Sequence, residues 1–352
     1  MYALGVMVGS SLDGQDVCLS KWWWDGKWHF SIVKAATFEL DPTFIRCILS
    51  RNFERYDVET FHRGNLAFTT EMAERLVDFL RGQPRPHVVG VHGPTVYHNE
   101  TVPYSIQLGE GDLLYARLKV PVVVNFRQLD QALGGPGAPI LPYVEKLVFP
   151  DYDAFLNLGG IANVDCWLDG RLHAVDVVPC NQLLNRLAFL QGKPYDEDGK
   201  MARQGQVIPS LLERLRMIQR DWPAVSMDRR EIEAVFWPLL KEENAPVEDK
   251  LRTVVEWVAL AVADHLEAYD RDCNVMITGG GAHNQLLVER IQDVVPTAVT
   301  LPDALLIDYK EALLFGLMAL LRFYGLPNTE LAAHHGLTAG ALYGAGPPQP
   351  LF

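Results

Sequence analysis

Short apolar runs separated by turn residues open the chain. Residues 2–8 are mostly apolar, residues 9–14 (GSSLDG) are typical of a turn, and a further apolar run ends at Asp25-Gly26. The same plan returns near Ala154, where two apolar runs are separated by a Gly/Asn turn and a third run follows an Asp-Gly turn. The pattern predicts two β-meanders, about 150 residues apart, and such a repeat indicates an internal duplication.

Helical and strand-like periods alternate between and after these meanders. Residues 68–80 have helical spacing, whereas residues 87–93 and 120–126 are short β-branched runs typical of buried strands. Residues 251–262 carry apolar side chains at helical spacing on one face, which predicts an amphipathic helix. Residues 274–278 form an apolar run that leads directly into a glycine turn and a further helix. Strands that alternate with helices predict an α/β fold.

The length of the chain predicts two domains. Its 352 residues exceed the size at which a single hydrophobic core keeps growing. We place the boundary at Phe149-Pro150, ahead of the second meander, which gives domains of residues 1–150 and 151–352. The proline-rich end, residues 346–352 (GPPQPLF), is expected to be a surface extension.

Charge and cysteine content narrow the range of partners. The net charge of −13 disfavours a broad attraction to nucleic acid or to an anionic membrane, so a small-molecule substrate fits better. The five cysteines are scattered without a CxxC pair, which argues against a disulfide framework and a zinc site. The first residues do not resemble a signal peptide, and the longest apolar stretch, residues 312–321, is too short to span a bilayer. We therefore expect a cytoplasmic protein without a membrane span.

Three strand-to-turn segments are rich in glycine, serine and asparagine: residues 9–14 (GSSLDG), 159–163 (GGIAN) and 279–284 (GGGAHN). Backbone without a Cβ presents successive N–H groups, and a polyphosphate needs this arrangement. One glycine turn alone is more often structural, but three turns in duplicated order favour a nucleotide site. The residues expected to hold the nucleotide are Gly9, Ser10, Ser11, Asp13, Gly14, Gly159, Gly160, Asn163, Gly279, Gly280 and Gly281.

Three residues beside these segments carry candidate chemistry. Asp13 is a candidate ligand of Mg²⁺, directly or through water, and its alternative role is that of an Asp-Gly turn residue. Asp176 lies at the end of an apolar strand, where its carboxylate could face a cleft and act as a general base, with a helix N-cap or turn role as the alternative. His92 also ends an apolar strand, where a histidine is more often a hydrogen-bonded structural group. The sequence has neither a Walker A segment nor the HRD and DFG motifs of protein kinases, so neither class is supported.

A polar segment follows the predicted strand at residues 120–126. Asn125, Arg127 and Asp130 lie close together there, ahead of a double-glycine loop. Ligands rich in hydroxyl groups are bound by this mixture of polar side chains. The alternative is a buried ion pair between Arg127 and Asp130, which their i, i+3 spacing allows.

The order of these motifs resembles that of the anhydro-N-acetylmuramic acid kinase family over nearly the whole chain. GVMVGSSLDGQD resembles the family's GxMSGTSxDGxD, GVHGPTVYH resembles SHGQTxxH, and NFRQLDQALGGPGAPILP resembles DFRxxDxAxGGQGAPLVP. In the second half, FLNLGGIANV, VDVVPCNQLL, YDEDGKMARQG, ITGGGAHNQLL and DYKEALLFGLMA resemble VLNIGGxxN, FDxGPGNxLM, FDxDGxxAxxG, CGGGAxN and EAxxFAxLA, respectively. Matches that keep one order along the chain argue against chance.

The resemblance implies a duplicated ribonuclease H-like fold, as in actin-like ATPases and sugar kinases, with ATP and Mg²⁺ in a cleft between two domains. It implies phosphorylation of 1,6-anhydro-N-acetylmuramic acid, with hydrolytic opening of the anhydro bridge, in peptidoglycan recycling. Asp176 matches the family's catalytic aspartate, which activates the attacking water while O6 takes the γ-phosphoryl group. A homodimer is expected by analogy. The candidate sugar contacts are His92, Asn125, Arg127, Asp130 and Glu311.

Several residues inside the motifs depart from the family's pattern. Val178 and Cys180 replace two glycines just after Asp176, where bulkier side chains would narrow the approach of the backbone to phosphate. Two alternatives to the kinase hypothesis therefore stay open. One is a kinase for a different amino sugar, and the other is a related protein that binds nucleotide or anhydro-sugar without turnover. The further departures are Val8, Ser10, Pro94, Asn125 and Pro136.

Overall fold

The chain folds into two compact units. The computed structural model describes residues 1–9, 14–41, 43, 57–99, 104–168, 171–221, 229–267, 273–331 and 334–346. One unit consists of Met1–Pro150 together with Tyr309–Phe352, and the other of Asp151–Asp308. The first segment ends at the predicted boundary. The prediction that residues 309–352 belong to the second domain is wrong, because strand β15 (Ala341–Tyr343) pairs with β7 (Val122–Val124) of the first unit.

The first unit is built on a six-stranded sheet with the order β15-β7-β4-β1-β2-β3. Strands β1, β2 and β3 form the predicted antiparallel meander, while β4 runs parallel to β1 and β7 runs parallel to β4. The added strand β15 is antiparallel to β7. The bounds of the remaining strands of this unit are β1 (Tyr2–Met7), β2 (Gln15–Trp24), β3 (Trp28–Phe38), β4 (Val88–His92), β5 (Thr95–Asn99), β6 (Tyr104–Gln107), β13 (Thr329–Leu331) and β14 (His334–Leu337).

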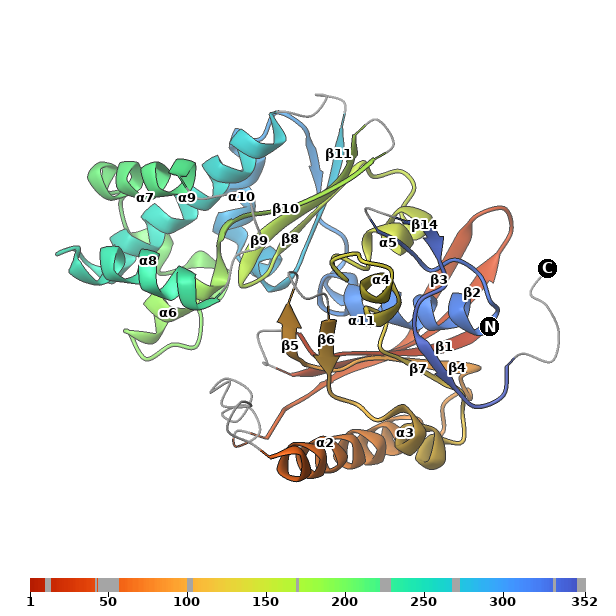
Figure 1. Cartoon of the computed structure of the whole chain (residues 1–352). Helices are drawn as coiled ribbons and strands as arrows, with labels where there is room; N and C mark the ends of the chain where they lie inside the picture. The colour runs from red at the N-terminus through yellow and green to blue at the C-terminus, as the bar shows by residue number, and fades with distance from the viewer. Residues whose placement is uncertain are drawn as a thin grey trace. The chain divides into compact units, whose positions relative to one another are not determined.

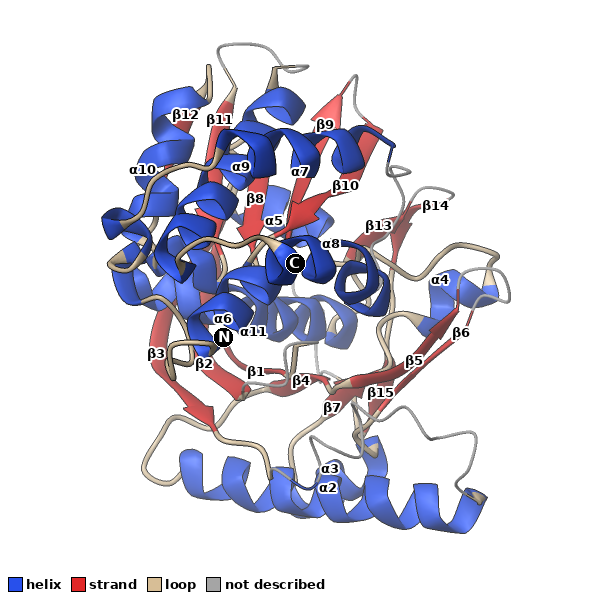
Figure 2. Cartoon of the chain, turned by 90° about the vertical axis from the view of Figure 1, so that its left-hand side faces the viewer, coloured by secondary structure: helices blue, strands red, loops and turns tan. Residues whose placement is uncertain are grey.

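Helices cover both faces of this first sheet. Figure 2 shows α2 (Val58–Phe79) and α3 (Gly111–Leu118) along one face of β1, β4 and β7, with α11 (Ala304–Phe323) on the other face. Gly5 and Gly90 lie against α11, where a Cβ would overlap the backbone of Ala312 and Phe315. The remaining helices of this unit are the short α4 (Gln128–Ala132) and α5 (Pro142–Val148).

The second unit repeats the plan in a five-stranded sheet with the order β10-β9-β8-β11-β12. Its bounds are β8 (Ala154–Leu158), β9 (Ile161–Leu168), β10 (Arg171–Pro179), β11 (Asn274–Thr278) and β12 (Ala298–Thr300). Strands β8, β9 and β10 form the second predicted antiparallel meander, and β11 runs parallel to both β8 and β12. Three antiparallel strands followed by two parallel ones thus occur in both units. The predicted α/β fold with a duplicated ribonuclease H-like plan is confirmed.

One long helix organises the core of the second unit. The predicted amphipathic helix is α9 (Val247–Leu266), and it packs against α6, α7, α10 and β10 (Figure 1). Its Trp257 is fully buried beside Phe236, with ring centroids 5.3 Å apart. The other helices are α6 (Asn181–Phe189), α7 (Pro209–Asp221), α8 (Arg229–Glu242) and α10 (Gln285–Val294), with 3₁₀ turns η2 (Glu197–Gly199), η3 (Ala202–Gln204) and η4 (Gly280–His283).

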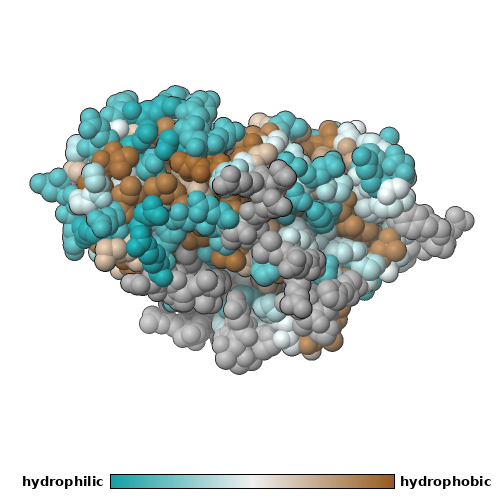
Figure 3. Space-filling view, turned by 90° about the horizontal axis from the view of Figure 1, so that it is seen from above, coloured by the Kyte–Doolittle hydropathy of each residue, from teal (hydrophilic) through white to brown (hydrophobic). Residues whose placement is uncertain are grey.

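The outer surface of the second unit is largely hydrophilic on the side that Figure 3 shows. Hydrophilic residues predominate over its helical layer, with smaller apolar areas between them. Across the described segments, each helix is either too short or too polar to span a membrane. The predicted surface extension beyond Gly346 lies outside the described residues.

Candidate active site

A row of polar side chains crosses four strands of the second sheet. Asn163 on β9 lies opposite Asp176 on β10 and opposite Asn157 on β8, and Asn157 lies opposite Thr278 on β11. Residues in register on neighbouring strands project from the same face, with Cβ atoms about 5 Å apart in antiparallel pairs. The flanking Ala162 and Val164 project from the other face into the hydrophobic core. Asp176 is therefore at one end of a polar row whose other members offer amide and hydroxyl groups.

A β-bulge follows Asp176. The register of β10 against β9 shifts between Asp176 and Val178, so that Val177 is the extra residue. A bulge bends the strand and redirects the side chains beside it, and bulges are frequent next to active sites. Asp176 is half-buried there.

The turn Gly159-Gly160 is fixed to the start of helix α6. The carbonyl of Gly160 accepts from the backbone N–H groups of Cys180 and Gln182, at 2.9 and 3.1 Å, and the carbonyl of Gly159 accepts from Asn181 at 3.2 Å. The first N–H groups of a helix have no acceptor inside the helix. At the start of α6, the carbonyls of Gly159 and Gly160 are the acceptors of these N–H groups. The glycine turn and the residues just after Asp176 are thereby held as one piece of backbone.

The segment Gly279–Gly281 packs against the same place. Gly279 has φ of 85°, a conformation that glycine adopts without strain, and a Cβ on it would overlap Asn157 and the backbone of Leu158. Gly281 lies against Leu158 and against the Asn181 side chain, whose Nδ2 donates to the Leu158 carbonyl at 2.9 Å. The predicted glycine segments of the second half therefore converge at one end of the sheet. The Asn181 side chain connects the two segments. It was not among the predicted site residues, although it belongs to the NQLL motif that follows Asp176.

Val178 and Cys180 do not obstruct this end of the sheet. Both side chains are completely buried in the hydrophobic core of the second unit. Burial also raises the pKa of the Cys180 thiol to about 12, so the thiol is uncharged at neutral pH. The expectation that these side chains narrow the approach to phosphate is wrong, because they project into the core.

The first unit carries an equivalent row of residues. Met7 on β1 lies opposite His92 on β4 and opposite Asp16 on β2, and Asp16 lies opposite Thr37 on β3. The Thr37 hydroxyl donates to Asp16 Oδ1 at 2.6 Å and lies 3.2 Å from the hydroxyl of Tyr309 on α11. The duplicated strand order thus places polar groups at the corresponding end of both sheets.

His92 is a neutral, buried member of this row. Burial and the neighbouring Arg127 cation hold its pKa well below the usual range. Arg127 Nε donates to His92 Nε2 at 3.1 Å, which places the imidazole proton on Nδ1, and Nδ1 is buried without a partner among the described residues. The ring stacks on Phe315 of α11 at 4.7 Å between centroids. His92 therefore orients Arg127 and has one donor left over.

The Arg127 guanidinium links His92 to the double-glycine loop. Its Nη1 donates to the Gly137 carbonyl at 2.8 Å. Burial lowers its pKa to about 10, so the group stays charged at neutral pH. The alternative of a buried ion pair between Arg127 and Asp130 is not observed: in the described part of the chain Arg127 bonds to His92 and Gly137, and Asp130 bonds elsewhere.

Asp130 anchors the loop that follows it. Its side chain is fully buried, and Oδ2 accepts from the Gly137 backbone N–H at 2.6 Å. Gly135 packs so closely on the carboxylate that a Cβ would overlap it. Asn125, at the start of the same segment, adopts φ of 59°, which asparagine tolerates better than most residues. Asp130 thus fixes the conformation of the double-glycine loop through its contacts with Gly135 and Gly137.

Glu311 is a half-buried carboxylate on α11. Burial raises its pKa above the usual value of 4.5, and the neighbouring Glu145 and Asp16 add to this effect. The cations Lys310 and Arg127 oppose it. The cluster of His92, Arg127 and Glu311, which the sequence predicted from three separate motifs, is thus assembled within the first unit.

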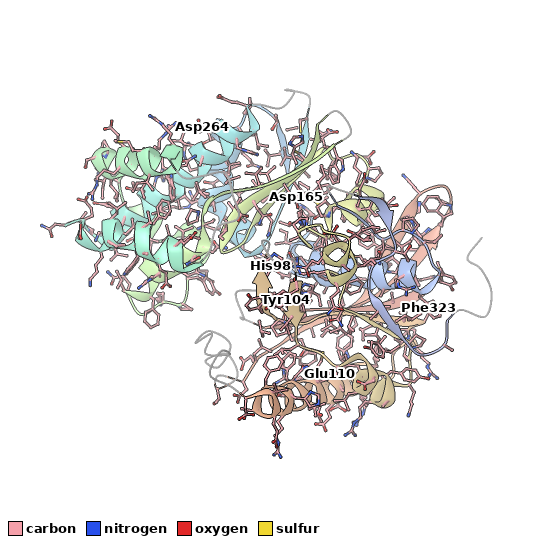
Figure 4. All side chains as sticks on the ribbon, in the orientation of Figure 1. His98, Tyr104, Glu110, Asp165, Asp264 and Phe323 are labelled. Atoms are coloured by element: carbon pink, nitrogen blue, oxygen red, sulfur yellow. The ribbon has the colours of Figure 1, made fainter. Side chains whose placement is uncertain are left out.

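A hairpin beside this cluster was not assigned from the sequence. His98 on β5 bonds through Nδ1 to the Ser105 hydroxyl on β6 at 2.9 Å, and Ser105 donates to Gln131 of α4 at 2.9 Å. Figure 4 labels His98 and Tyr104, one on each strand of this hairpin. His98 is the second histidine of the GVHGPTVYH segment. Its place in that motif was the feature of the sequence that could have identified it as a candidate site residue.

Part of the first glycine segment lies outside the described residues. Ser10, Ser11 and Asp13 are among these, whereas Gly9 and Gly14 are described. Val8 is buried in the core, and its N–H donates to the His92 carbonyl at 3.0 Å. Over the described segments, groups of three or more metal-binding side chains are not found. Mg²⁺ in kinases needs only one or two carboxylates besides phosphate and water. Asp13, the predicted ligand, lies outside the described residues.

Comparison with known sequences gives one consistent family. The model of the family "Anhydro-N-acetylmuramic acid kinase" matches residues 1–348. Proteins with that name from Aliivibrio fischeri and Paramagnetospirillum magneticum are 30% identical over 93% of this chain and 94% of theirs, and 35% identical over 81% of both, respectively. A ROK family glucokinase from Streptomyces griseus, solved with glucose and AMPPNP, is 12% identical, with a TM-score of 0.46 over 91% of this chain and 99% of its own.

Proposed function

The chain belongs to the anhydro-N-acetylmuramic acid kinase family, and from that premise we propose that it is a carbohydrate kinase of peptidoglycan recycling. It transfers the γ-phosphoryl group of ATP to O6 of 1,6-anhydro-N-acetylmuramic acid while water opens the anhydro bridge. The supporting observation is the placement of Asp176, which is half-buried at a β-bulge close to the Gly159-Gly160 turn and the start of α6. A general base needs this combination of a fixed backbone and access to a water molecule.

In this proposal Asp176 is the catalytic base. Its carboxylate takes a proton from the water that attacks the anomeric carbon. The bond from this carbon to O6 breaks, and O6 takes the phosphoryl group. Asn163, opposite Asp176, and the glycines of the two turns beside it supply amide groups for the phosphates, as the sequence predicts for Gly159, Gly160 and Gly279–Gly281. Asp13 and its neighbours Gly9, Ser10, Ser11 and Gly14 would hold Mg²⁺ and phosphate in the first unit.

The sugar contacts are divided between direct and indirect roles. Arg127 and Glu311 are half-buried, so we assign them, with Asn125, to hydrogen bonds with the sugar. His92 and Asp130 are buried, and we assign them to positioning: His92 orients Arg127, and Asp130 shapes the double-glycine loop. Removing Asp130 would therefore weaken sugar binding through the loop.

We also propose that the protein acts in the cytoplasm, as a homodimer, on small molecules. The net charge of −13 supports an acidic surface without affinity for nucleic acid. The main argument for a binding protein without turnover was that Val178 and Cys180 would obstruct the phosphate site. This argument no longer applies, because both side chains lie in the core.

Substitution of Asp176 tests this function. Asp176→Asn keeps the shape of the side chain but cannot accept a proton, so turnover with ATP and 1,6-anhydro-N-acetylmuramic acid should fall about 10²–10⁴-fold, with an unchanged melting temperature. Asp165→Asn is the matched control, since Asp165 lies on the same face of β9 two residues beyond Asn163 (Figure 4). Full activity of Asp176→Asn would remove Asp176 from the mechanism. A panel of other amino sugars, measured in parallel, decides the substrate.

A further inference from the structure

A chain of hydrogen bonds joins the β5–β6 hairpin to the double-glycine loop of the first unit. His98 Nδ1 lies 2.9 Å from the Ser105 hydroxyl, which lies 2.9 Å from Gln131 Oε1. At the other side of the same amide group, Gln131 Nε2 donates to the Pro136 carbonyl at 3.3 Å. Ser105 and Gln131 are 3% and 4% exposed, respectively, whereas His98 is exposed. The chain therefore leads from an exposed imidazole through two buried side chains into the loop.

The directions of these hydrogen bonds are fixed from the loop outward. A backbone carbonyl can only accept, so the amide nitrogen of Gln131 faces Pro136 and its oxygen faces Ser105. The Ser105 hydroxyl has one proton and donates it to this oxygen, so it accepts from His98. The proton of the neutral imidazole is thus held on Nδ1, and Nε2 carries the lone pair. The chain sets His98 as a hydrogen-bond acceptor at Nε2.

The loop at the inner end of this chain also holds Arg127. The Gly137 carbonyl accepts from Arg127 Nη1 at 2.8 Å, and the Gly137 N–H donates to Asp130 Oδ2 at 2.6 Å. Gly137 has φ of 74°, and a Cβ on it would overlap the Gln131 side chain. Gln131 therefore packs on the residue that fixes the guanidinium. Because α4 also packs against β6, His98 and Arg127 belong to one connected part of the structure.

Gln131 is a feature of this chain that the motif does not specify. In the pattern DFRxxDxAxGGQGAPLVP, the position of Gln131 is open and the position of Pro136 is glutamine. Proline has no backbone N–H, so the carbonyl is the one polar group that Pro136 offers. Gln131 donates to that carbonyl. The proline and the glutamine that bonds to it thus occur together in this loop.

We propose that His98 is a further sugar contact and that Ser105 and Gln131 are its positioning residues. Held as an acceptor at Nε2, His98 binds a donor group of the sugar, whereas Arg127 offers only donors. 1,6-Anhydro-N-acetylmuramic acid has two donors at neutral pH, the O4 hydroxyl and the acetamido N–H. This role rests on the proposed function, because the sugar is the one named there.

The substitution His98→Asn separates the contact from its support. The asparagine amide can replace Nδ1 as a donor to Ser105, but it offers nothing in place of Nε2. KM for the sugar should rise about 2–10-fold, as expected for one lost hydrogen bond, with kcat and KM for ATP unchanged. A purely structural role would instead lower the melting temperature without this selective change in KM.

The residues behind His98 are tested by breaking the chain. Ser105→Ala and Gln131→Met should each raise KM for the sugar by a similar factor. Because both act through one contact, the double variant should equal the more severe single variant rather than multiply their effects. Gln128→Met, at an exposed position of the same helix, is the matched control and should leave KM unchanged. Should Gln131→Met not fold, Ser105→Ala and His98→Asn carry the test.

Two sugar analogues identify the donor that His98 binds. The 4-deoxy sugar lacks the hydroxyl, and the analogue with an acetate ester at C2 lacks the N–H. The rise in KM caused by His98→Asn should vanish for the analogue without the bound donor and persist for the other. A rise of equal size for the parent sugar and both analogues would overturn the contact.

The tautomer of His98 is tested without turnover. ¹⁵N NMR of the wild-type imidazole should place the proton on Nδ1, and Ser105→Ala should shift it toward Nε2, while Gln128→Met keeps the wild-type signal. A wild type that turns over no sugar counts against the proposed function. An active protein whose KM for the sugar is unchanged in His98→Asn, or a wild-type His98 protonated on Nε2, would overturn the present proposal.

Discussion

At the scale of single residues, the direction of a side chain decides what a substitution within a motif means. Val178 and Cys180, which closely follow Asp176, stand where the family pattern that the sequence resembles has glycine. The sequence shows their size but not the face from which they project, and the β-bulge at this point makes simple alternation unreliable. Both project into the core and fill space there. Their presence is a matter of packing rather than of phosphate binding.

This distinction can be measured. Val178→Gly/Cys180→Gly should destabilise the protein by about 2–5 kcal/mol, because two buried side chains leave a cavity and two flexible residues enter a strand end. Denaturant unfolding measures the change. Leu190→Ala, at an exposed position just after α6, is the control and should change stability by less than about 0.5 kcal/mol. Higher turnover in the double glycine variant, without loss of stability, would show that these residues do obstruct the site.

The candidate site was predictable only as far as local pattern allowed. Asp176 lies near the end of β10 and the glycine turns follow strands, so their position at the end of a sheet could be predicted. The partners of Arg127 could not, because His92 is 35 residues away and the i, i+3 neighbour Asp130 looked equally suitable. Buried ion pairs such as Lys310–Glu145 leave no periodic signal in the sequence.

At the scale of elements, close backbone packing places α11 on the first sheet. Gly5 on β1 and Gly90 on β4 lack side chains at the points where the helix backbone of Ala312 and Phe315 approaches. This approach places α11, and with it Glu311, against the strands that carry His92 and Asp16. The β-meanders and α9 were predictable because their hydrophobic periods are local. The pairing of β15 with β7 was not, since it joins segments far apart in the chain.

The packing of α11 gives a test at this scale. Gly90→Ala should destabilise the protein by about 3 kcal/mol or more, because the new methyl group overlaps backbone atoms of α11 that cannot move independently. Gly64→Ala is the matched control. Gly64 lies in α2 with open space around its Cα, so alanine should stabilise the helix by up to about 1 kcal/mol. Thermal or denaturant unfolding compares the two variants, and equal effects would refute the packing argument.

At the scale of the whole molecule, the same strand order in both units places polar residues at equivalent ends of the two sheets. Ligands that bind the native protein and not the unfolded chain stabilise it by mass action. Mg-ATP at 100 times its Kd should therefore raise the free energy of unfolding by about 2.7 kcal/mol. A thermal melt at millimolar Mg-ATP reads this directly, with magnesium alone as the control. An unchanged melting temperature, with and without sugar, would argue against nucleotide binding.

The reaction itself is the most direct test of the central claim. Purified protein is incubated with Mg-ATP and 1,6-anhydro-N-acetylmuramic acid, and the product is identified by mass and NMR. The account predicts stoichiometric formation of ADP and of N-acetylmuramic acid phosphorylated at O6, with a free reducing end, and the loss of this product in Asp176→Asn. A phosphorylated sugar with an intact anhydro bridge, or ADP formation without any sugar product, would contradict it.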